Sequence, residues 1–153
     1  MLLIGNGCIS LDEERTQMAI WSIVAAPLIM GNDMRNVSAA SMAILTNPHA
    51  IAVDQDPLGH QGQLAFNNCP AGATGGAVPS CQHVWARPLK GGRAAVIFVN
   101  YATTPTKVWY LGCLGGRVVV SSVVSRMLVV LRVRKARDAT VTLCRGDAHP
   151  SLV

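Results

Sequence analysis

The fold is decided by residues 1–33, which read MLLIGNGCISLDEERTQMAIWSIVAAPLIMGND. Two short apolar runs, at 2–4 and 28–30, are each followed by glycine and asparagine, a combination that marks a turn. Neither run alternates with polar residues, and an unbroken apolar strand is typical of a parallel sheet that is covered on both faces. We therefore expect a βαβ unit with strands at 2–5 and 28–31. The ends of these strands place Asn6, Asn32 and Asp33 where ligand sites of parallel sheets lie, either as site residues or as ordinary turn formers.

The segment between the two runs carries the signals of a helix. Ser10 stands three residues before Glu13, which is the spacing of a capping box at a helix N-terminus. Apolar residues then recur at helical spacing from Met18 onwards. Pro27 disfavours the helical conformation for the residue before it. These signals predict a helix over residues 10–26.

A second helix is expected from Ser38, as its cap, to Asn47, followed by a short apolar segment at 51–53 and a turn at 54–59. Asp54 and Asp56 lie in this turn, one residue apart. Two such carboxylates could hold a metal ion, or they could simply form an aspartate-proline-glycine turn at a domain boundary. The sequence favours the turn.

After Gly59 the sequence changes to β-like runs at 83–87 and 93–101, separated by a Gly-Gly connection that is typical of a hairpin. This pattern predicts the start of an antiparallel β domain. Cys69 and Cys81 bracket a loop rich in glycine, alanine and proline, and they either form a disulfide that closes it or remain free thiols. The five cysteines show no zinc-finger spacing, so no metal site is expected.

Charge is distributed unevenly along the 153 residues, of which half are apolar. Residues 1–110 hold equal numbers of basic and acidic side chains, whereas residues 111–153 hold seven Lys and Arg against two Asp. The net charge of +5 therefore belongs to a Val-rich basic tail, and it does not indicate a nucleic-acid partner for the rest. The apolar run at 18–30 is shorter than the ~20 residues that span a bilayer, so no membrane partner is expected either.

Residues 1–6, 17–21, 25–35 and 51–59 resemble, in order and spacing, the α-galactosidase/α-N-acetylgalactosaminidase family of retaining glycoside hydrolases. Residues 85–89 resemble the start of that family's C-terminal β domain. The resemblance implies an α/β plus β fold, with the last two β/α units of a (β/α)8 barrel followed by an antiparallel β-sandwich. It divides the chain into a barrel end at 1–59, the start of the β domain at 60–110 and a tail at 111–153 that does not align.

The family hydrolyses terminal α-linked galactose, or its N-acetylamino relative, with two aspartates and without a cofactor. Both aspartates lie on earlier barrel strands, so the resemblance implies that no catalytic residue is present here and that the chain alone is inactive. Only Met1 matches a position that lines the sugar. The expected partner of the full-length parent is an α-galactoside, and the parent is expected to be a homodimer. The sequence does not decide between galactose and N-acetylgalactosamine.

Two further features leave alternatives open. Asn36 begins an N-glycosylation sequon, which matters if the parent is secreted, lysosomal or vacuolar as relatives often are, although no signal peptide is visible at the start of the chain. The second function considered is a non-catalytic carbohydrate-binding β module, in which Trp85, Tyr101 and Trp109 stack on sugars. Against it, a tryptophan in an alternating strand more often belongs to the core.

Overall fold

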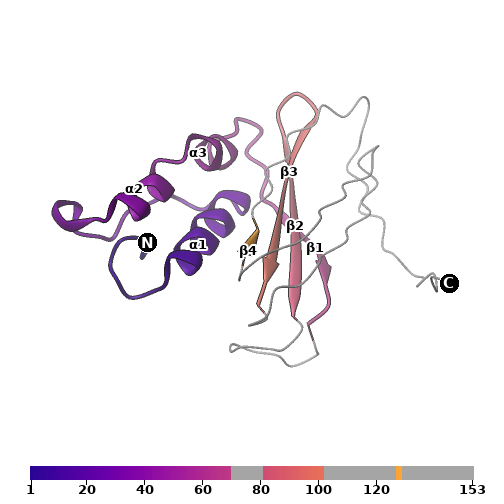
Figure 1. Ribbon diagram of the computed structural model, residues 1–153. Helices are drawn as coiled ribbons and strands as arrows, with labels where there is room; N and C mark the ends of the chain where they lie inside the picture. Colours follow the sequence, from indigo (N-terminus) through magenta and orange to yellow (C-terminus); the bar gives the residue numbers. More distant parts are fainter. Residues whose placement is uncertain (70–80, 102–126, 129–153) are drawn as a thin grey trace.

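The computed structural model describes residues 1–69, 81–101 and 127–128, and these form helices and strands that lie side by side (Figure 1). In chain order the elements are α1 (Leu11–Ile23), the 3-10 turn η1 (Met34–Asn36), α2 (Ala39–Leu45), α3 (Pro48–Asp54), β1 (Gln63–Asn67), β2 (Gln82–Leu89), β3 (Arg93–Asn100) and β4 (Met127–Leu128). The strands form one sheet in the order β1-β2-β3-β4. The chain is therefore an α/β segment joined to an antiparallel sheet.

The two apolar runs that open the sequence pair in parallel, although only through a single bridge. Leu2 and Met30 are bridge partners. The Leu2 N–H donates to Ile29 O at 2.8 Å, and the Gly31 N–H donates back to Leu2 O at 3.2 Å. The prediction of full strands at 2–5 and 28–31 was too long, because each run has this one partner among the described residues and a ladder needs neighbours along its length.

Helix α1 begins as the sequence predicts. Ser10 Oγ accepts a hydrogen bond from the Glu13 N–H, and Glu13 Oε2 accepts one from the Ser10 N–H at 2.8 Å, which completes the capping box. The helix ends at Ile23, three residues before the predicted end. The helix ends before Pro27 because Ala25 has a left-handed φ of 56°, which is incompatible with the interior of an α-helix. Pro27 was thus the wrong terminator.

Helices α2 and α3 follow with only two residues between them. Ser38 caps α2 as predicted, through a hydrogen bond that its Oγ accepts from the Ser41 N–H. Asn47 then caps a third helix, and Pro48 occupies its first turn, where the missing N–H costs nothing. The apolar segment at 51–53, for which no helix was expected, lies in α3, because the Asn-Pro pair that ends one helix also starts the next.

The hairpin expected after residue 82 is confirmed. Strands β2 and β3 pair antiparallel, with Gln82 opposite Asn100 at one end and Leu89 opposite Arg93 at the other. The connection contains Gly91 and Gly92, both with φ in the left-handed region. Strand β1, which the sequence did not indicate, pairs with β2 and contains an irregularity after Leu64. Part of the Val-rich stretch at 118–133 forms β4, which pairs with β3, and the rest of that stretch lies outside the described residues.

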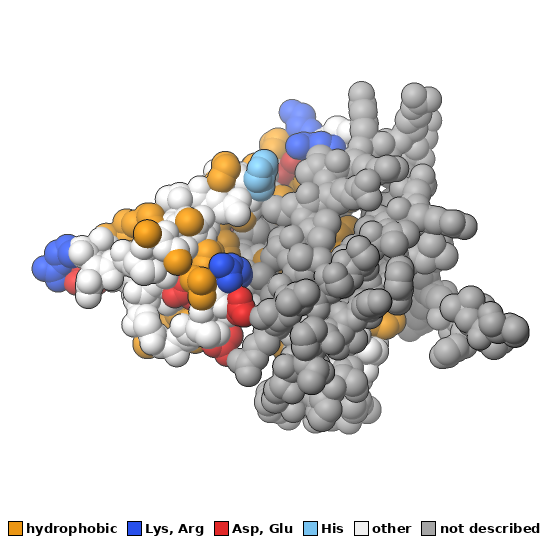
Figure 2. All heavy atoms as spheres, viewed as in Figure 1, with side chains coloured by type: hydrophobic (Ala, Val, Ile, Leu, Met, Phe, Trp, Pro, Cys, Tyr) orange, Lys and Arg blue, Asp and Glu red, His pale blue; other side chains and the backbone are white. Residues whose placement is uncertain are grey.

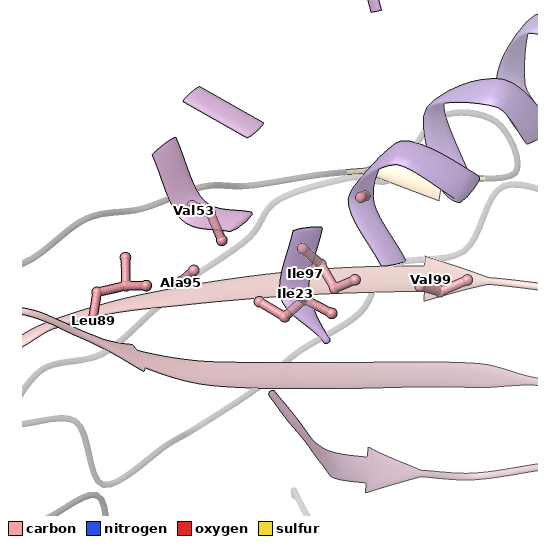
Figure 3. Packing of buried hydrophobic residues seen from close by; sticks show 7 residues of the cluster. Ile23, Val53, Leu89, Ala95, Ile97 and Val99 are labelled. Atoms are coloured by element: carbon pink, nitrogen blue, oxygen red, sulfur yellow. The ribbon is translucent and has the colours of Figure 1, made fainter. Parts of the chain in front are cut away.

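The core between the helices and the sheet is built from both halves of the chain. We call it the helix–sheet core; its buried members are Ala19, Ile23, Val53, Leu89, Ala95, Ile97 and Val99. Figure 3 shows Ile23 of α1 and Val53 of α3 next to Leu89 of β2 and Ala95 and Ile97 of β3. A second buried cluster joins the first apolar run to the helices through Leu2, Ile4, Met18, Leu45 and Ala50. Burial of these side chains is the main force that holds helices and sheet together.

Large apolar side chains also remain exposed in the helical part, where Figure 2 shows them in orange. They include Met1, Leu3, Ile29 and Met30, which are in the parallel bridge or next to it in sequence, and Met34 of η1. Contiguous exposed apolar surface on a soluble protein marks a surface that packs against something else. Within the described ranges, none of the helices has both the length and the apolar character required to cross a membrane.

Candidate functional site

The turns that follow the two apolar runs meet at one end of the α/β segment. Asn6 Nδ2 donates a hydrogen bond to Gly31 O at 3.2 Å. A Cβ added to Gly5 would stand 3.0 Å from Asn32 Nδ2, so the Asn32 side chain lies directly against this glycine. Gly5 has a φ of 85°, which a side chain would strain. The structure therefore brings Asn6 and Asn32 together, as expected for the carboxyl ends of neighbouring parallel strands.

The buried side chains of Glu14 and Asn32 at this strand end differ in their hydrogen bonding. Glu14 is buried, and its Oε1 accepts a hydrogen bond from the Gly5 N–H at 2.8 Å. Both polar atoms of the Asn32 side chain are buried without a hydrogen-bond partner in the described part of the chain. A buried amide without partners costs free energy, and buried polar groups are usually satisfied. Asn32 thus offers an amide NH2 donor group and a carbonyl acceptor to whatever completes this end.

Met1 lies beside this strand end. A Cβ on Gly31 would be 3.3 Å from Met1 Cβ and Cε, so the Met1 side chain rests on Gly31. The Met1 residue is 74% exposed. Its thioether therefore offers apolar surface next to the polar groups of Asn6 and Asn32.

Asp33 and Asp56, two aspartates of the α/β segment, have structural partners. Asp33 accepts hydrogen bonds from the Arg35 side chain, the shortest at 2.7 Å, and these bonds lower the pKa of the Asp33 carboxyl. Asp56 is buried, and its Oδ1 accepts from the N–H groups of Leu58 at 3.0 Å and Lys90 at 2.9 Å. Asp56 Oδ2 pairs with Arg93 at 3.2 Å. These contacts explain Asp56 as a turn former that also ties the turn to the hairpin.

Arg87 joins the helices to the sheet, and the sequence analysis did not single it out. Its Nη1 donates to Ser22 O and to Val53 O, both at 2.7 Å, and its Nη2 donates to Asp54 O at 3.2 Å. The residue is 1% exposed. Neither α1 nor α3 has a basic residue in its last turn, so this guanidinium from β2 supplies the positive charge that favours both helix C-termini.

Asp54 lies close to Arg87, which joins the helices to the sheet. Burial raises the pKa of the Asp54 carboxyl, and the positive charge of Arg87 opposes the shift. One carboxylate oxygen of Asp54 is buried without a hydrogen-bond partner among the described residues. The signal that could have found Arg87 in the sequence is its position two residues after Trp85 and two before Leu89, on the strand face that packs against the helix–sheet core.

Cys69 and Cys81 form a disulfide, which decides between the two alternatives left open by the sequence. His83 lies beside it, with Nε2 at 3.1 Å from Cys69 Sγ. The His83 ring packs edge-on against Tyr101 at 4.9 Å between centroids. Burial lowers the pKa of His83, which favours the neutral imidazole.

The remaining candidates lie apart from one another. Asn36 is exposed at the end of η1, on the surface of the α/β segment. Trp85 is half-buried and packs against the helix–sheet core, which agrees with a core role, whereas Tyr101 is 39% exposed. Trp109 lies outside the described residues. The structure thus does not assemble Trp85 and Tyr101 into an exposed sugar-stacking surface.

Comparison with known proteins gives this architecture a class. Residues 1–56 match the melibiase family described as alpha galactosidase A. The chain is 40% identical over 108 residues to α-galactosidase 3 of Arabidopsis thaliana, covering 71% of this chain and 23% of the relative. It is 42% identical over 103 residues to human α-N-acetylgalactosaminidase, covering 67% and 23%.

Solved structures agree with these sequence matches. α-Galactosidase I from Mortierella vinacea superposes with a TM-score of 0.59 at 28% identity, over 71% of this chain and 24% of that one. The α-galactosidase from Saccharomyces cerevisiae with raffinose gives 0.61 at 27% identity, over 69% and 23%. An α/β segment followed by an antiparallel sheet is thus an arrangement that this chain shares with solved α-galactosidases.

The chain belongs to the α-galactosidase and α-N-acetylgalactosaminidase family of glycoside hydrolases. It spans about a quarter of the length of the relatives that it matches. It is therefore similar to one segment of those proteins rather than to a whole member.

Proposed function

We propose that this chain supplies the end of the barrel and the start of the β domain of a retaining glycoside hydrolase that removes terminal α-linked galactose. In this assignment residues 1–59 contribute the last two β/α units, residues 60–110 begin the β-sandwich, and residues 111–153 form the tail. The observation that supports it is the parallel Leu2–Met30 bridge, whose two sides are connected through α1 as in a βαβ unit. The match of residues 1–56 to the family supports the same placement.

The chemistry of the parent requires groups that this segment does not offer in its described part. A retaining hydrolase holds two carboxyl groups ~5–5.5 Å apart, one as nucleophile and one as acid and base. Here Asp33 is paired with Arg35, and Asp56 is buried in its turn contacts. We propose that the reacting aspartates of the parent stand on earlier barrel strands, and that the present chain by itself does not turn over substrate.

The contribution of the segment is then to hold and orient the sugar. The strand-end groups of Asn6 and Asn32 are amide donors and acceptors that match sugar hydroxyls, and Met1 provides apolar surface beside them. The exposed apolar surface around the parallel bridge supports the placement of the preceding barrel strand against it.

A chimera tests this proposal. Residues 1–101 replace the matched segment of Arabidopsis α-galactosidase 3, and hydrolysis of 4-nitrophenyl α-galactoside is followed for the chimera and for the isolated chain. We expect activity in the chimera and none in the chain alone. In the chimera, Asn32→Ala should lower kcat/KM about tenfold, the equivalent of one lost hydrogen bond of about 1.4 kcal/mol. Gln55→Ala, at an exposed position in the same segment, should leave kcat/KM unchanged.

Two outcomes contradict the proposal. A chimera that folds, as judged by circular dichroism and gel filtration, but cleaves no α-galactoside would remove the segment from this role. Turnover by the isolated chain would show that its own side chains suffice for the reaction. Replacement of the galactoside by the N-acetylgalactosaminide in the same assay distinguishes the two sugars.

Two properties of the parent follow from the same assignment. We propose that Asn36 carries an N-linked glycan when the parent enters the secretory pathway, because the side chain is exposed on η1. Secretion of the chimera from a eukaryotic host should give a glycosidase-sensitive mobility shift that is lost in Asn36→Gln. We also propose that the parent is a homodimer, which sedimentation of the chimera tests directly.

A further inference from the structure

The disulfide region brings three potential metal ligands together. Cys69 Sγ, Cys81 Sγ and His83 Nε2 all lie within 4.8 Å of one another. Cys81 is buried, and the other two residues are half-buried. Thiolate sulfur and imidazole nitrogen are the ligands that zinc prefers in proteins.

Hydrogen bonds tie the segments around the two cysteines together in addition to the disulfide. Asn68 and Gln82, the neighbours of the two cysteines, exchange hydrogen bonds in both directions. The Gln82 N–H donates to Asn68 Oδ1 at 2.6 Å, and Asn68 Nδ2 donates to Gln82 Oε1 at 3.0 Å. The Tyr101 N–H donates to Cys81 O at 2.8 Å, which anchors this end of β2 to the end of β3. The two cysteine backbones therefore stay close when the bond between their sulfur atoms is broken.

The histidine is also held in place from the side away from the sulfur atoms. Its ring packs edge-on against Tyr101 at 4.9 Å and lies 6.4 Å from the Trp85 ring. His83 Nδ1 is buried without a hydrogen-bond partner in the described part of the chain. Nε2 is thus the ring nitrogen that faces the two sulfur atoms, and it needs no change of rotamer to become a ligand.

We propose that reduction converts this disulfide into a zinc site, in which Cys69 Sγ, Cys81 Sγ and His83 Nε2 bind one Zn²⁺ and a water takes the fourth position. A dithiol reductant supplies two electrons and two protons; the S–S bond breaks, two thiols form, and the reductant leaves as its own disulfide. Zn²⁺ then displaces the two thiol protons into solvent, while Nε2 donates its lone pair.

The required movement is small. With Zn–S bonds of ~2.3 Å and a Zn–N bond of ~2.0–2.1 Å, a tetrahedral site places the sulfur atoms about 3.8 Å apart and each sulfur about 3.6 Å from the nitrogen. Cys69 Sγ and His83 Nε2 are now 3.1 Å apart. Rotation of the two cysteine side chains after reduction supplies the remaining separation. The same three residues therefore form either a disulfide or a metal centre, depending on the redox state of their surroundings.

Cobalt titration tests the proposal in the full chain. Cys8, Cys113 and Cys144 are first changed to serine, the protein is reduced with a dithiol, and the reductant is removed without oxygen. We expect one equivalent of Co²⁺ to bind with thiolate-to-cobalt absorption in the near ultraviolet, and Zn²⁺ to displace it. In His83→Ala the affinity for Co²⁺ should fall about 100-fold, because loss of a group that only supports a metal ligand already costs about 10–100-fold. His60→Ala should leave the affinity for Co²⁺ unchanged.

The oxidised protein is the second control, because sulfur atoms bonded to each other do not bind the ion as thiolates. Far-ultraviolet circular dichroism of both forms reports whether the strands persist. The proposal is overturned if the reduced protein binds no Co²⁺, or if the His83→Ala variant binds Co²⁺ as tightly as the protein that retains His83. It is equally overturned if reduction abolishes the strand signal and Zn²⁺ does not restore it.

Discussion

Replacement of Arg87 by methionine should separate the helices from the sheet. The methionine side chain fills a similar space but donates no hydrogen bond, so the carbonyl groups of Ser22, Val53 and Asp54 lose their donor. The carbonyls lie at the C-terminal ends of α1 and α3. Ser22 O and Val53 O then keep only backbone contacts near the helix end, such as the 3.4 Å bonds from the Ala25 and Asp56 N–H groups.

The size of the effect follows from these contacts. A hydrogen bond to a charged group contributes about 1.5–3 kcal/mol, and loss of the two 2.7 Å bonds at the lower end of that range gives about 3 kcal/mol. Urea unfolding followed by tryptophan fluorescence measures it; with a slope of about 1.5 kcal/mol/M, the midpoint should fall by about 2 M.

Two further variants serve as controls for Arg87→Met. Arg87→Lys keeps the charge but loses the planar fork that reaches two helix ends at once, so the loss should be intermediate. Arg15→Met removes an arginine that is half exposed on α1 and pairs with Asp12, and it should change stability by no more than about 0.5 kcal/mol. A midpoint for Arg87→Met that matches Arg15→Met would refute the role assigned to the buried guanidinium.

Three further predictions concern stability. Ser10→Ala removes the hydroxyl from the capping box with Glu13 and should lower the unfolding free energy by about 1 kcal/mol, measured in urea. Gly62→Ala places a Cβ on the carbonyl of Ile23, where there is no room, and should lower the thermal midpoint; an unchanged midpoint contradicts the packing. Burial raises the pKa of Asp54 in the folded protein, so ionisation of this carboxyl opposes folding. Asp54→Asn should therefore stabilise the protein at neutral pH. The difference in unfolding free energy between the two proteins should vanish as the pH falls below 3.8, and urea unfolding at both pH values measures it.

Local features of this protein were predictable because their partners are close in sequence. Ser10 and Glu13 form a capping box across one helical turn, and Ser38 caps α2 through the residue three positions later. The glycines at 91 and 92 specify the hairpin for the same reason. The end of α1 was predicted less well, since the left-handed Ala25 has no marker in the sequence.

The strand-end site was predictable in its position and not in its contacts. Glycine and asparagine after each apolar run placed Asn6 and Asn32 at one edge, because parallel strands end together. The sequence did not reveal that the Asn32 amide is buried without partners while Asn6 bonds to Gly31 O. Those differences arise from backbone approach between segments 25 residues apart.

The sequence by itself determined where α1 and α2 begin, the β2–β3 hairpin and the family resemblance, and it left the pairing of Cys69 with Cys81 as one of two alternatives. Only the tertiary structure decided how these parts are joined. Arg87 reaches the carbonyl of Ser22 across 65 residues, and His83 meets Cys69 across the closed loop. Such contacts depend on the packing of one element against another, and no local preference of either residue specifies them, because the free energy that orders them comes from burial of the shared core.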